Sequence, residues 1–327
     1  MLESDKGVDV EGIGKSFGSV EALQGISFDV GRGEVVALLG PNGAGKTTTV
    51  EILSTLTKPD RGRARVAGHD VVTDPAMVRR SIMLTGQHVA LDEMLTGYEN
   101  LVMFGRLQGL KKSAARVRAR HLLGEFDLEH AADRRVGTYS GGMRRRVDIA
   151  CGLVVRPKVV FLDEPTTGLD PRSRQAIWNL VATFKQAGIA TLLTTQYLEE
   201  ADALADRVVL IDRGREVAAG TPAELKNQVG QQRVDVIAAD ATAYMRLSHL
   251  LADRFEVSLS AEQRTVSVAA PEEASDLARV AAMVDGAGIA VDEVALRRPT
   301  LDDAFLALTG VPARDETDIQ TEEEVAA

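Results

Sequence analysis

The chain has 327 residues, of which 45% are hydrophobic and 26% are charged, and its formal net charge is −10. This length allows two domains, and the composition is that of an ordinary globular protein. The excess of acidic residues argues against a protein that binds nucleic acid through non-specific charge. No run approaches the roughly 18–20 apolar residues of a membrane-spanning helix, and the first residues lack the apolar core of a signal peptide. We therefore expect the protein to stay in the cytoplasm, free or bound to a larger assembly.

Cysteine and histidine usage excludes two further kinds of site. Cys151 is the only cysteine, so there is no intrachain disulfide and no cysteine-based metal cluster. Its neighbours in the sequence are apolar, and we expect a buried side chain rather than a reactive thiol. The five histidines lie far apart in the sequence and show no metal-ligand spacing.

A glycine-rich loop follows the first fully apolar run of the chain, Val35–Leu39. The loop has the complete G-x-x-x-x-G-K-[ST] pattern, and a segment with helical periodicity comes directly after it. Glycines in such a loop let backbone N–H groups approach phosphate oxygens, and the helix N-terminus adds further donors. Lys46 can reach the β- and γ-phosphates, and the Thr47 hydroxyl can ligate Mg²⁺. We predict that nucleotide phosphates bind at Gly40, Pro41, Asn42, Gly43, Ala44, Gly45, Lys46, Thr47 and Thr48.

Two side chains near this loop are open to more than one interpretation. Val8–Ile13 and Ile26–Val30 alternate like half-exposed strands, and Phe17 lies between them. Its ring can stack on a purine, although a phenylalanine in a β-rich region is more often part of the core. Gly86 and Gln87 follow the apolar run Ser81–Thr85, and a single glutamine at a strand end is usually only a polar surface residue.

From about residue 88 to residue 157 the pattern becomes helical. Thr96 and Glu99 form a capping box that opens an amphipathic helix. Further along, Ser140 is a suitable N-cap, and Gly141 and Gly142 leave the first turn of the next helix bare. Such a helix start is able to bind an anion, but Ser-Gly-Gly alone is more often only a cap.

Two adjacent carboxylates follow a second fully apolar run, Val159–Leu162. Asp163 and Glu164 therefore come just after a buried strand, where carboxylates can handle Mg²⁺ and activate water. Adjacent acids at a loop start can equally be only solvated, but an apolar run followed by Asp-Glu in a chain with a phosphate loop favours the metal site. Asp170 belongs to the Gly-Leu-Asp sequence that follows, and Gln196 comes directly after the next expected strand. Strands that alternate with helices imply a mostly parallel sheet covered by helices, with its ligand beyond the carboxyl ends of the strands.

The pattern changes again near residue 230. Beyond that point strands and helices form a small α+β pattern, and Thr300 and Asp303 can cap a final helix. We therefore expect a nucleotide-binding domain at 1–230, an accessory domain at 231–313 and an acidic disordered tail at 314–327.

Taken together, these motifs resemble the ATP-binding subunits of ABC transporters over about the first 230 residues. The matches are GPNGAGKTT (Walker A), Gln87 (Q-loop), YSGGM (signature), VVFLDEP (Walker B) and GLD (D-loop), in that family's order. The segments TYSGGMRRRVDIA, DEPTTGLDPRSR and LDDAFLALTG are similar to those of the daunorubicin-resistance ATP-binding proteins. The resemblance implies an α/β P-loop NTPase with a mostly parallel central sheet, an antiparallel β subdomain and a helical subdomain at about 88–157, followed by the small α+β domain.

The resemblance also implies that two copies of the chain enclose two ATP molecules. Ser140, Gly141 and Gly142 of one copy would close over the γ-phosphate held by the phosphate loop of the other. Asp170 would lie at the seam between the copies, and the ring of Phe17 would stack on adenine.

The same resemblance assigns the chemistry to a small set of polar residues. Thr47 and Asp163 would support Mg²⁺, and Gln87 would contact the metal or the water and relay to the membrane partner. Glu164 would orient and polarise the attacking water.

The sequence departs from the family pattern at two places. Tyr139 and Met143 stand where LSGGQ is commoner, although the Ser-Gly-Gly core is intact. Gln196 stands where the family usually has a histidine that contacts the γ-phosphate. A glutamine amide can donate a hydrogen bond to phosphate, but it cannot carry a titrating proton near neutral pH. Gln196 therefore stays in the candidate catalytic set as a donor, and Glu164 is left as the candidate base.

On this resemblance we expect the ATP-hydrolysing subunit of an exporter, located peripherally at the cytoplasmic face of the cell membrane. Its expected partners are a second copy and a separate membrane permease, which would bind most of the cargo, an anthracycline-like antibiotic or an amphipathic lipid. No nucleic-acid partner is expected. The alternative is a soluble ABC-type ATPase that acts on ribosomes or nucleic acid, but this chain has one Walker A motif and neither a long coiled-coil nor a zinc insertion.

Overall fold

The computed structural model describes residues 6–86, 91–228, 232–270, 272 and 274–309. Gln87 and the expected tail at 314–327 therefore lie outside the described residues. The chain divides into two compact units between Pro222 and Ala223. Within the described ranges, no helix combines the length and the apolar character needed to cross a membrane.

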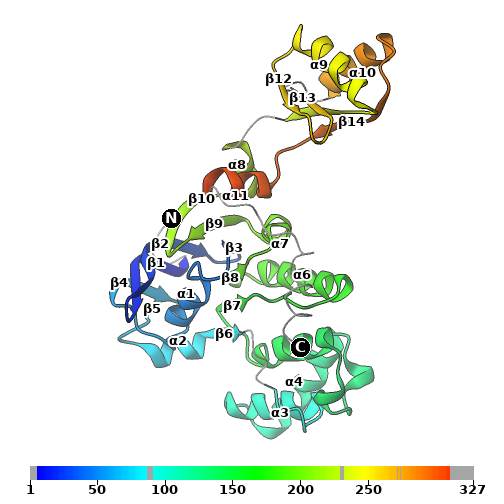
Figure 1. Ribbon diagram of the computed structural model, residues 1–327. Coiled ribbons are helices and arrows are strands. Elements are labelled where there is room, and N and C mark those ends of the chain that lie inside the picture. The colour runs from blue at the N-terminus through cyan, green and yellow to red at the C-terminus, as the bar shows by residue number, and fades with distance from the viewer. Residues whose placement is uncertain (1–5, 87–90, 229–231, 271, 273, 310–327) are drawn as a thin grey trace. The chain divides into compact units, whose positions relative to one another are not determined.

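A six-stranded sheet forms the centre of the first unit (Figure 1). The strands lie in the order β10 (Arg215–Gly220), β9 (Arg207–Asp212), β3 (Val35–Leu39), β8 (Ala190–Thr195), β7 (Val159–Asp163) and β6 (Ile82–Thr85). The strands from β9 to β6 are parallel, and β10 pairs antiparallel with β9. Every residue of β3 and β7 is buried, which explains why their sequences are nearly continuous apolar runs. The expected mostly parallel central sheet is confirmed.

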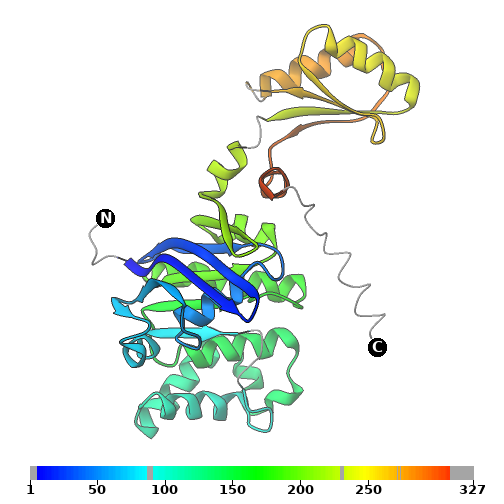
Figure 2. The ribbon, with the colours of Figure 1, turned by 60° about the vertical axis from the view of Figure 1, so that its left-hand side comes forward.

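A second, antiparallel sheet has the order β2 (Val20–Gly31), β1 (Lys6–Phe17), β4 (Arg61–Val66) and β5 (His69–Asp70). Its long β1–β2 hairpin, blue in Figure 2, lies across the central sheet. Helix α1 (Lys46–Leu53) packs between strands of the two sheets, and its Val50, Ile52 and Leu53 belong to one apolar core with residues of both. This core holds the start of α1, and with it the phosphate loop, against two sheets.

The helical part of the first unit lies beside strand β6 (Figure 1). It contains α3 (Gly97–Leu107), α4 (Lys112–Glu125), α5 (Gly141–Gly152) and two short 3-10 turns, Glu129–Ala131 and Val136–Thr138. The predicted capping box is confirmed, because the Thr96 hydroxyl accepts from Glu99 N–H while the Glu99 carboxylate accepts from Thr96 N–H. The remaining helices of this unit are α2 (Pro75–Ser81), α6 (Pro171–Gln186) and α7 (Leu198–Leu204), and the last two pack against central strands.

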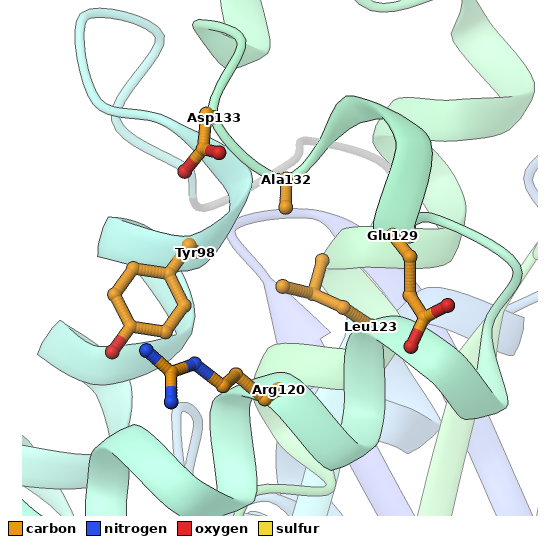
Figure 3. A pocket seen from close by; sticks show the side chains of 6 residues that line it. All are labelled: Tyr98, Arg120, Leu123, Glu129, Ala132 and Asp133. Carbon is orange, nitrogen blue, oxygen red and sulfur yellow. The ribbon is translucent and has the colours of Figure 1, made fainter.

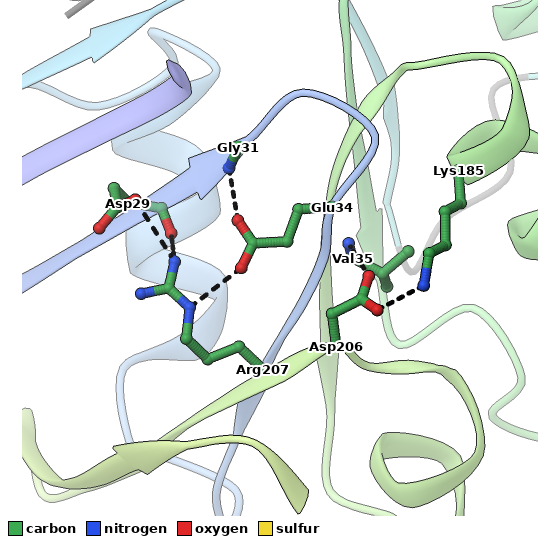
Figure 4. A network of polar contacts seen from close by, with 7 residues as sticks. All are labelled: Asp29, Gly31, Glu34, Val35, Lys185, Asp206 and Arg207. Atoms are coloured by element: carbon green, nitrogen blue, oxygen red, sulfur yellow. Dashed lines mark hydrogen bonds and ion pairs between the residues drawn. The ribbon is translucent and has the colours of Figure 1, made fainter. Parts of the chain in front are cut away.

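A polar network fixes the amino ends of the central strands, away from the phosphate loop (Figure 4). Glu34, just before β3, accepts a hydrogen bond of 3.0 Å from Arg207 at the start of β9. Asp206 accepts from Val35 N–H at 3.0 Å and also pairs with Lys185 of α6. These contacts fix how β3 and β9 are aligned along their length. They therefore also fix the position of the carboxyl ends of these strands, where the phosphate loop begins.

The second unit contains an antiparallel sheet with the strand order β12 (Val257–Ser260), β13 (Thr265–Ala269), β11 (Arg233–Ala238) and β14 (Val291–Arg297). With α9 (Ala241–Ala252) and α10 (Ala274–Gly286) the chain order is β-α-β-β-α-β, a ferredoxin-like arrangement. Among the described residues, the buried cluster that forms its core runs from Val234 to Ile289, and Val291, Val294 and Leu296 of β14 pack against it. Helices α8 (Pro222–Gln228) and α11 (Leu301–Thr309) flank this sheet in the sequence, and the Thr300 hydroxyl caps α11 by accepting from Asp303 N–H. The expected α+β class is confirmed.

Candidate nucleotide site

The predicted phosphate loop connects β3 to α1, and its glycines are required by the surrounding backbone. A Cβ atom on Gly40 would lie 2.1 Å from the carbonyl oxygen of Ile211 at the end of β9. Gly45 has a φ of 107°, in the left-handed region that only glycine adopts readily. The loop therefore lies closer to the end of β9 than any residue with a side chain at position 40 would allow.

The Lys46 side chain is buried at the centre of this loop. Its Nζ donates to the carbonyl oxygens of Gly40 at 2.7 Å and Pro41 at 3.1 Å, and it lies 3.5 Å from Glu164 Oε1. Burial lowers the pKa of Lys46 from its ordinary value, and the nearby Glu164 and Asp163 carboxylates oppose this shift. The structure thus brings the loop lysine together with both predicted carboxylates, Asp163 at the end of β7 and Glu164 directly after it.

Asp163 and Glu164 are oriented by one residue of the neighbouring strand, Thr194. Asp163 Oδ1 accepts a hydrogen bond of 2.5 Å from the Thr194 hydroxyl. Glu164 N–H donates to both the carbonyl and the hydroxyl oxygen of Thr194, each at 3.1 Å. Glu164 has a φ of 46°, and such a left-handed backbone in a non-glycine residue costs of order 1–3 kcal/mol. The Glu164 carboxylate is therefore placed by a backbone that its surroundings hold in an unfavourable conformation.

A pocket of about 570 Å³ brings several predicted residues to one surface. Asn42 of the phosphate loop, Gly141 at the start of α5, Glu164 and Gln196 all line it. Gln196 comes directly after β8, so two of these side chains follow the carboxyl ends of adjacent parallel strands. This is the edge at which the alternation of strands and helices predicted a ligand.

The starts of helices α5 and α6 contact each other within the chain. Ser140 caps α5 by accepting from Met143 N–H at 3.3 Å, and Asp170 caps α6 by accepting from the N–H and the hydroxyl of Ser173. A Cβ atom on Gly142 would lie 2.1 Å from Ser173 Oγ. The structure therefore shows the capping role of Ser140, whereas its binding of an anion stays a prediction.

Phe17 ends strand β1 and is half exposed, with 50% of its surface accessible. Lys15 Nζ lies 5.4 Å from the centre of its ring. The ring is therefore not part of the core, which was one of the two interpretations that the sequence left open. Its stacking on adenine stays a prediction. Cys151 is buried as expected, and burial raises the pKa of its thiol.

A magnesium site that depends on phosphate oxygens fits the residues present. Among the described residues, no group of three or more His, Cys, Asp or Glu side chains could hold a metal ion alone. Mg²⁺ is usually held by one or two carboxylates together with waters and substrate phosphates rather than by an all-protein cage. Asp163 and the exposed Thr47 at the start of α1 provide such a partial ligand set.

Two residues that position this site were missed by the sequence analysis, Thr194 and Arg145. Thr194 lies in the expected strand 190–195, but nothing in the sequence distinguishes it from its neighbour Thr195. Arg145 stands in a run of three arginines and is buried beside the end of β7. Its spacing from Gly142 and Ile149 places it on the buried face of α5, and this helical period is the signal that could have revealed it.

A second pocket, of about 310 Å³, lies in the helical region (Figure 3). The Arg120 guanidinium lies 5.8 Å from the centre of the Tyr98 ring, and Leu123 adds an apolar side chain. Glu129 and Asp133 line it as well. The described residues that line this pocket include none of the predicted nucleotide-site residues.

Known proteins are similar to this chain in both sequence and fold. The family model described as ABC transporter matches residues 23–167. The chain is 56% identical to the Doxorubicin resistance ATP-binding protein DrrA of Mycobacterium tuberculosis, over 97% of this chain and 98% of that protein. It is 50% identical to the Daunorubicin resistance ATP-binding protein DrrA2 of Streptomyces coeruleorubidus, over 93% of this chain and 95% of that protein.

A solved structure gives the same result for the fold. The structure of an ATP-binding cassette in a dimeric post-hydrolysis state, bound to ADP and phosphate, matches with a TM-score of 0.60 at 25% identity. The match covers 65% of this chain and 98% of that chain. The chain therefore belongs to the ATP-binding proteins of ABC transporters, which are ATPases, and within them to the group of daunorubicin and doxorubicin resistance ATP-binding proteins.

Proposed function

We propose that this chain hydrolyses MgATP as the homodimeric motor of an exporter and that it drives a separate membrane permease. The observation that carries the proposal is the meeting of Lys46, Asp163 and Glu164 at the end of the central strands. The names of the relatives support a drug cargo, so we propose an anthracycline-like antibiotic, or an amphipathic lipid, bound mainly by the permease. On this proposal the protein is peripheral, at the cytoplasmic face of the cell membrane.

The proposed chemistry assigns one task to each group. The phosphate loop and Lys46 hold the triphosphate, and Thr47 and Asp163 hold Mg²⁺, which neutralises charge on the phosphates. Glu164 orients and polarises the attacking water, and the Gln196 amide donates a hydrogen bond to the γ-phosphate.

The remaining predicted residues act on the nucleotide from its other sides. Ser140–Gly142 and Asp170 of a second copy complete the site, and Phe17 stacks on adenine. Gln87, which lies outside the described residues, keeps in this proposal the role that the family pattern assigns to it, contact with the metal or the water. The ribosome or nucleic-acid alternative gains no support, because the relatives above are named as drug-resistance ATP-binding proteins.

Replacement of Glu164 by glutamine tests this proposal. Glu164→Gln keeps the shape of the side chain but replaces one acceptor oxygen by an amide donor and removes the negative charge and the basicity. The phosphate loop is unchanged, so we expect ATP binding to persist. Turnover should fall by about 10²–10⁴-fold, the usual contribution of a positioned base. The measurements are steady-state ATPase activity and the nucleotide dissociation constant.

Glu199→Gln is the matched control, because this exposed glutamate lies on α7 outside the site. We expect the control to retain near-normal turnover. Near-normal turnover in Glu164→Gln itself would remove Glu164 from the reaction.

A further inference from the structure

The Arg145 side chain is buried and donates to three backbone carbonyl groups. These groups lie at or just beyond the carboxyl ends of two strands, β6 and β7. Its Nε donates to Pro165 O at 3.0 Å, its Nη1 to Gly86 O at 2.8 Å and its Nη2 to Asp163 O at 3.3 Å. Only 6% of the residue is exposed. A buried guanidinium is costly unless its donors are paired, and here each nitrogen has an acceptor.

Two of these acceptors are the carbonyl groups on either side of Glu164. Asp163 precedes Glu164 and Pro165 follows it, so one guanidinium holds the backbone before and after this residue. Glu164 is the residue whose φ of 46° lies in the left-handed region. Such a conformation persists only where neighbouring groups determine it, and Arg145 supplies two of the contacts that do so.

The position of Arg145 is itself determined by helix α5. Asp148, three residues further along the same helix, lies 3.6 Å from Arg145 Nη1, and both side chains are buried. The third acceptor, Gly86, follows strand β6 on the far side of β7 from β8. A single side chain of α5 therefore ties this helix to the carboxyl ends of β6 and β7.

We propose that Arg145 is a positioning residue for ATP hydrolysis, which fixes the backbone of Glu164 and so the place of the carboxylate that acts on water. The inference rests on the proposed role of Glu164. The fork geometry is essential to it, because a lysine ammonium is a point charge that cannot hold three carbonyl groups in one plane. Arg145 does not contact the nucleotide in this proposal and acts only through Glu164.

The test compares Arg145→Gln and Arg145→Lys with the unchanged full-length chain. A misplacement of a catalytic group by about 1 Å can cost about 10²-fold in rate, so we expect turnover to fall by about 10–100-fold in Arg145→Gln. Arg145→Lys should recover part of this loss, since the ammonium can still reach one carbonyl. The dissociation constant for ATP should stay within about threefold in both variants, because Lys46 and the phosphate loop are not touched.

Arg118→Gln is the matched control. Arg118 also donates to two backbone carbonyl groups, Leu153 O at 3.0 Å and Val154 O at 3.4 Å, but at the opposite end of α5. We expect this control to lower thermal stability and to leave turnover within about twofold, the size expected of a change with no contact to the site. Equal losses of turnover in Arg118→Gln and Arg145→Gln would reduce Arg145 to a general support of the fold and overturn the proposal.

A double-mutant cycle decides whether Arg145 acts through Glu164. Once Glu164→Gln has removed the base, adding Arg145→Gln should slow single-turnover hydrolysis by less than about twofold, because coupled sites are not additive. If the second change slows Glu164→Gln by the same factor as the unchanged chain, the proposal fails while the role of Glu164 stands. If Glu164→Gln alone has no effect, the proposed role of Glu164 fails first.

Discussion

Thr194 is the residue on which the geometry of the two carboxylates depends most directly. Its hydroxyl donates to Asp163 and accepts from Glu164 N–H, so one oxygen atom orients both the proposed metal ligand and the proposed base. Hydrogen bonds to charged groups contribute about 1.5–3 kcal/mol, more than those between neutral groups. Removal of this single hydroxyl should therefore lower the rate of ATP hydrolysis.

Thr194→Val removes the hydroxyl and keeps the shape of the side chain. We expect turnover to fall by about 10–100-fold, with a higher Mg²⁺ concentration needed for half-maximal rate, because Asp163 loses a charge-assisted bond. The measurement is ATPase activity as a function of Mg²⁺ concentration.

Thr191→Val, on the same strand, provides the comparison, since its hydroxyl bonds only to the Ile189 carbonyl among the described contacts. An unchanged Mg²⁺ dependence in Thr194→Val would show that Asp163 does not need this hydroxyl for metal binding.

The helices, strands and loops that the sequence predicted are those that neighbouring residues determine. The apolar runs of β3 and β7, the phosphate loop and the capping box of α3 were all predicted, because a few neighbouring residues determine each of them. Strands β12 and β14 were not predicted. In β12 Val257 and Leu259 alternate with serines over only four residues, β14 shows no regular alternation, and no residue of either strand is buried.

The sequence predicted the site residues that belong to motifs, but not the residues that position them. Lys46, Asp163 and Glu164 belong to motifs that require particular residue types, and the structure brings them together. Arg145 belongs to a basic run that usually indicates a solvated face, and its burial follows from the packing of α5 against β6 and β7. The one local signal is the helical period that places Arg145 on the same face of α5 as Gly142 and Ile149, and it does not show which strands that face contacts.

The capping box at the start of α3 gives a prediction for one element. Thr96→Ala removes the side chain that accepts from the third residue of the helix, which usually lowers stability by about 0.5–2 kcal/mol. We therefore expect a lower thermal midpoint for the first unit and an unchanged affinity for ATP, because α3 contributes no side chain to the nucleotide site. The measurements are a thermal unfolding scan and a nucleotide titration. A midpoint equal to that of the unchanged chain would mean that the helix start is held by other contacts.

At the scale of the whole molecule, the two units have separate cores. The core that holds α1 draws on both sheets of the first unit, whereas the described buried residues that form the core of the second unit lie between 234 and 289. The domain boundary expected near 230 follows a change of sequence pattern, and the division between Pro222 and Ala223 lies at the start of α8. We propose that the second unit regulates or steadies dimer formation, because it has a core of its own and contributes no proposed ligand to the nucleotide.

The proposed dimer predicts a particular kind of complementation. Lys46→Ala disables the phosphate loop, and Ser140→Arg blocks the opposite surface, so each variant alone should lack turnover. In a two-fold dimer each site takes one surface from each copy, so an equimolar mixture should recover about one quarter of normal turnover. The measurement is ATPase activity as a function of the mixing ratio, with a maximum at equal amounts. A mixture as inactive as its components would exclude sites shared between copies.

Because Lys46 contacts Glu164, the Glu164 carboxylate competes with the nucleotide phosphates for the Lys46 ammonium. A triphosphate that engages this ammonium has to displace an anion already held 3.5 Å away. Glu164→Gln removes this competing charge as well as the base. Tighter retention of ATP by this variant therefore has two separate origins, the lost competition for Lys46 and the slower hydrolysis of bound ATP. Product affinity tells them apart, because ADP is not hydrolysed and gains only from the missing competition.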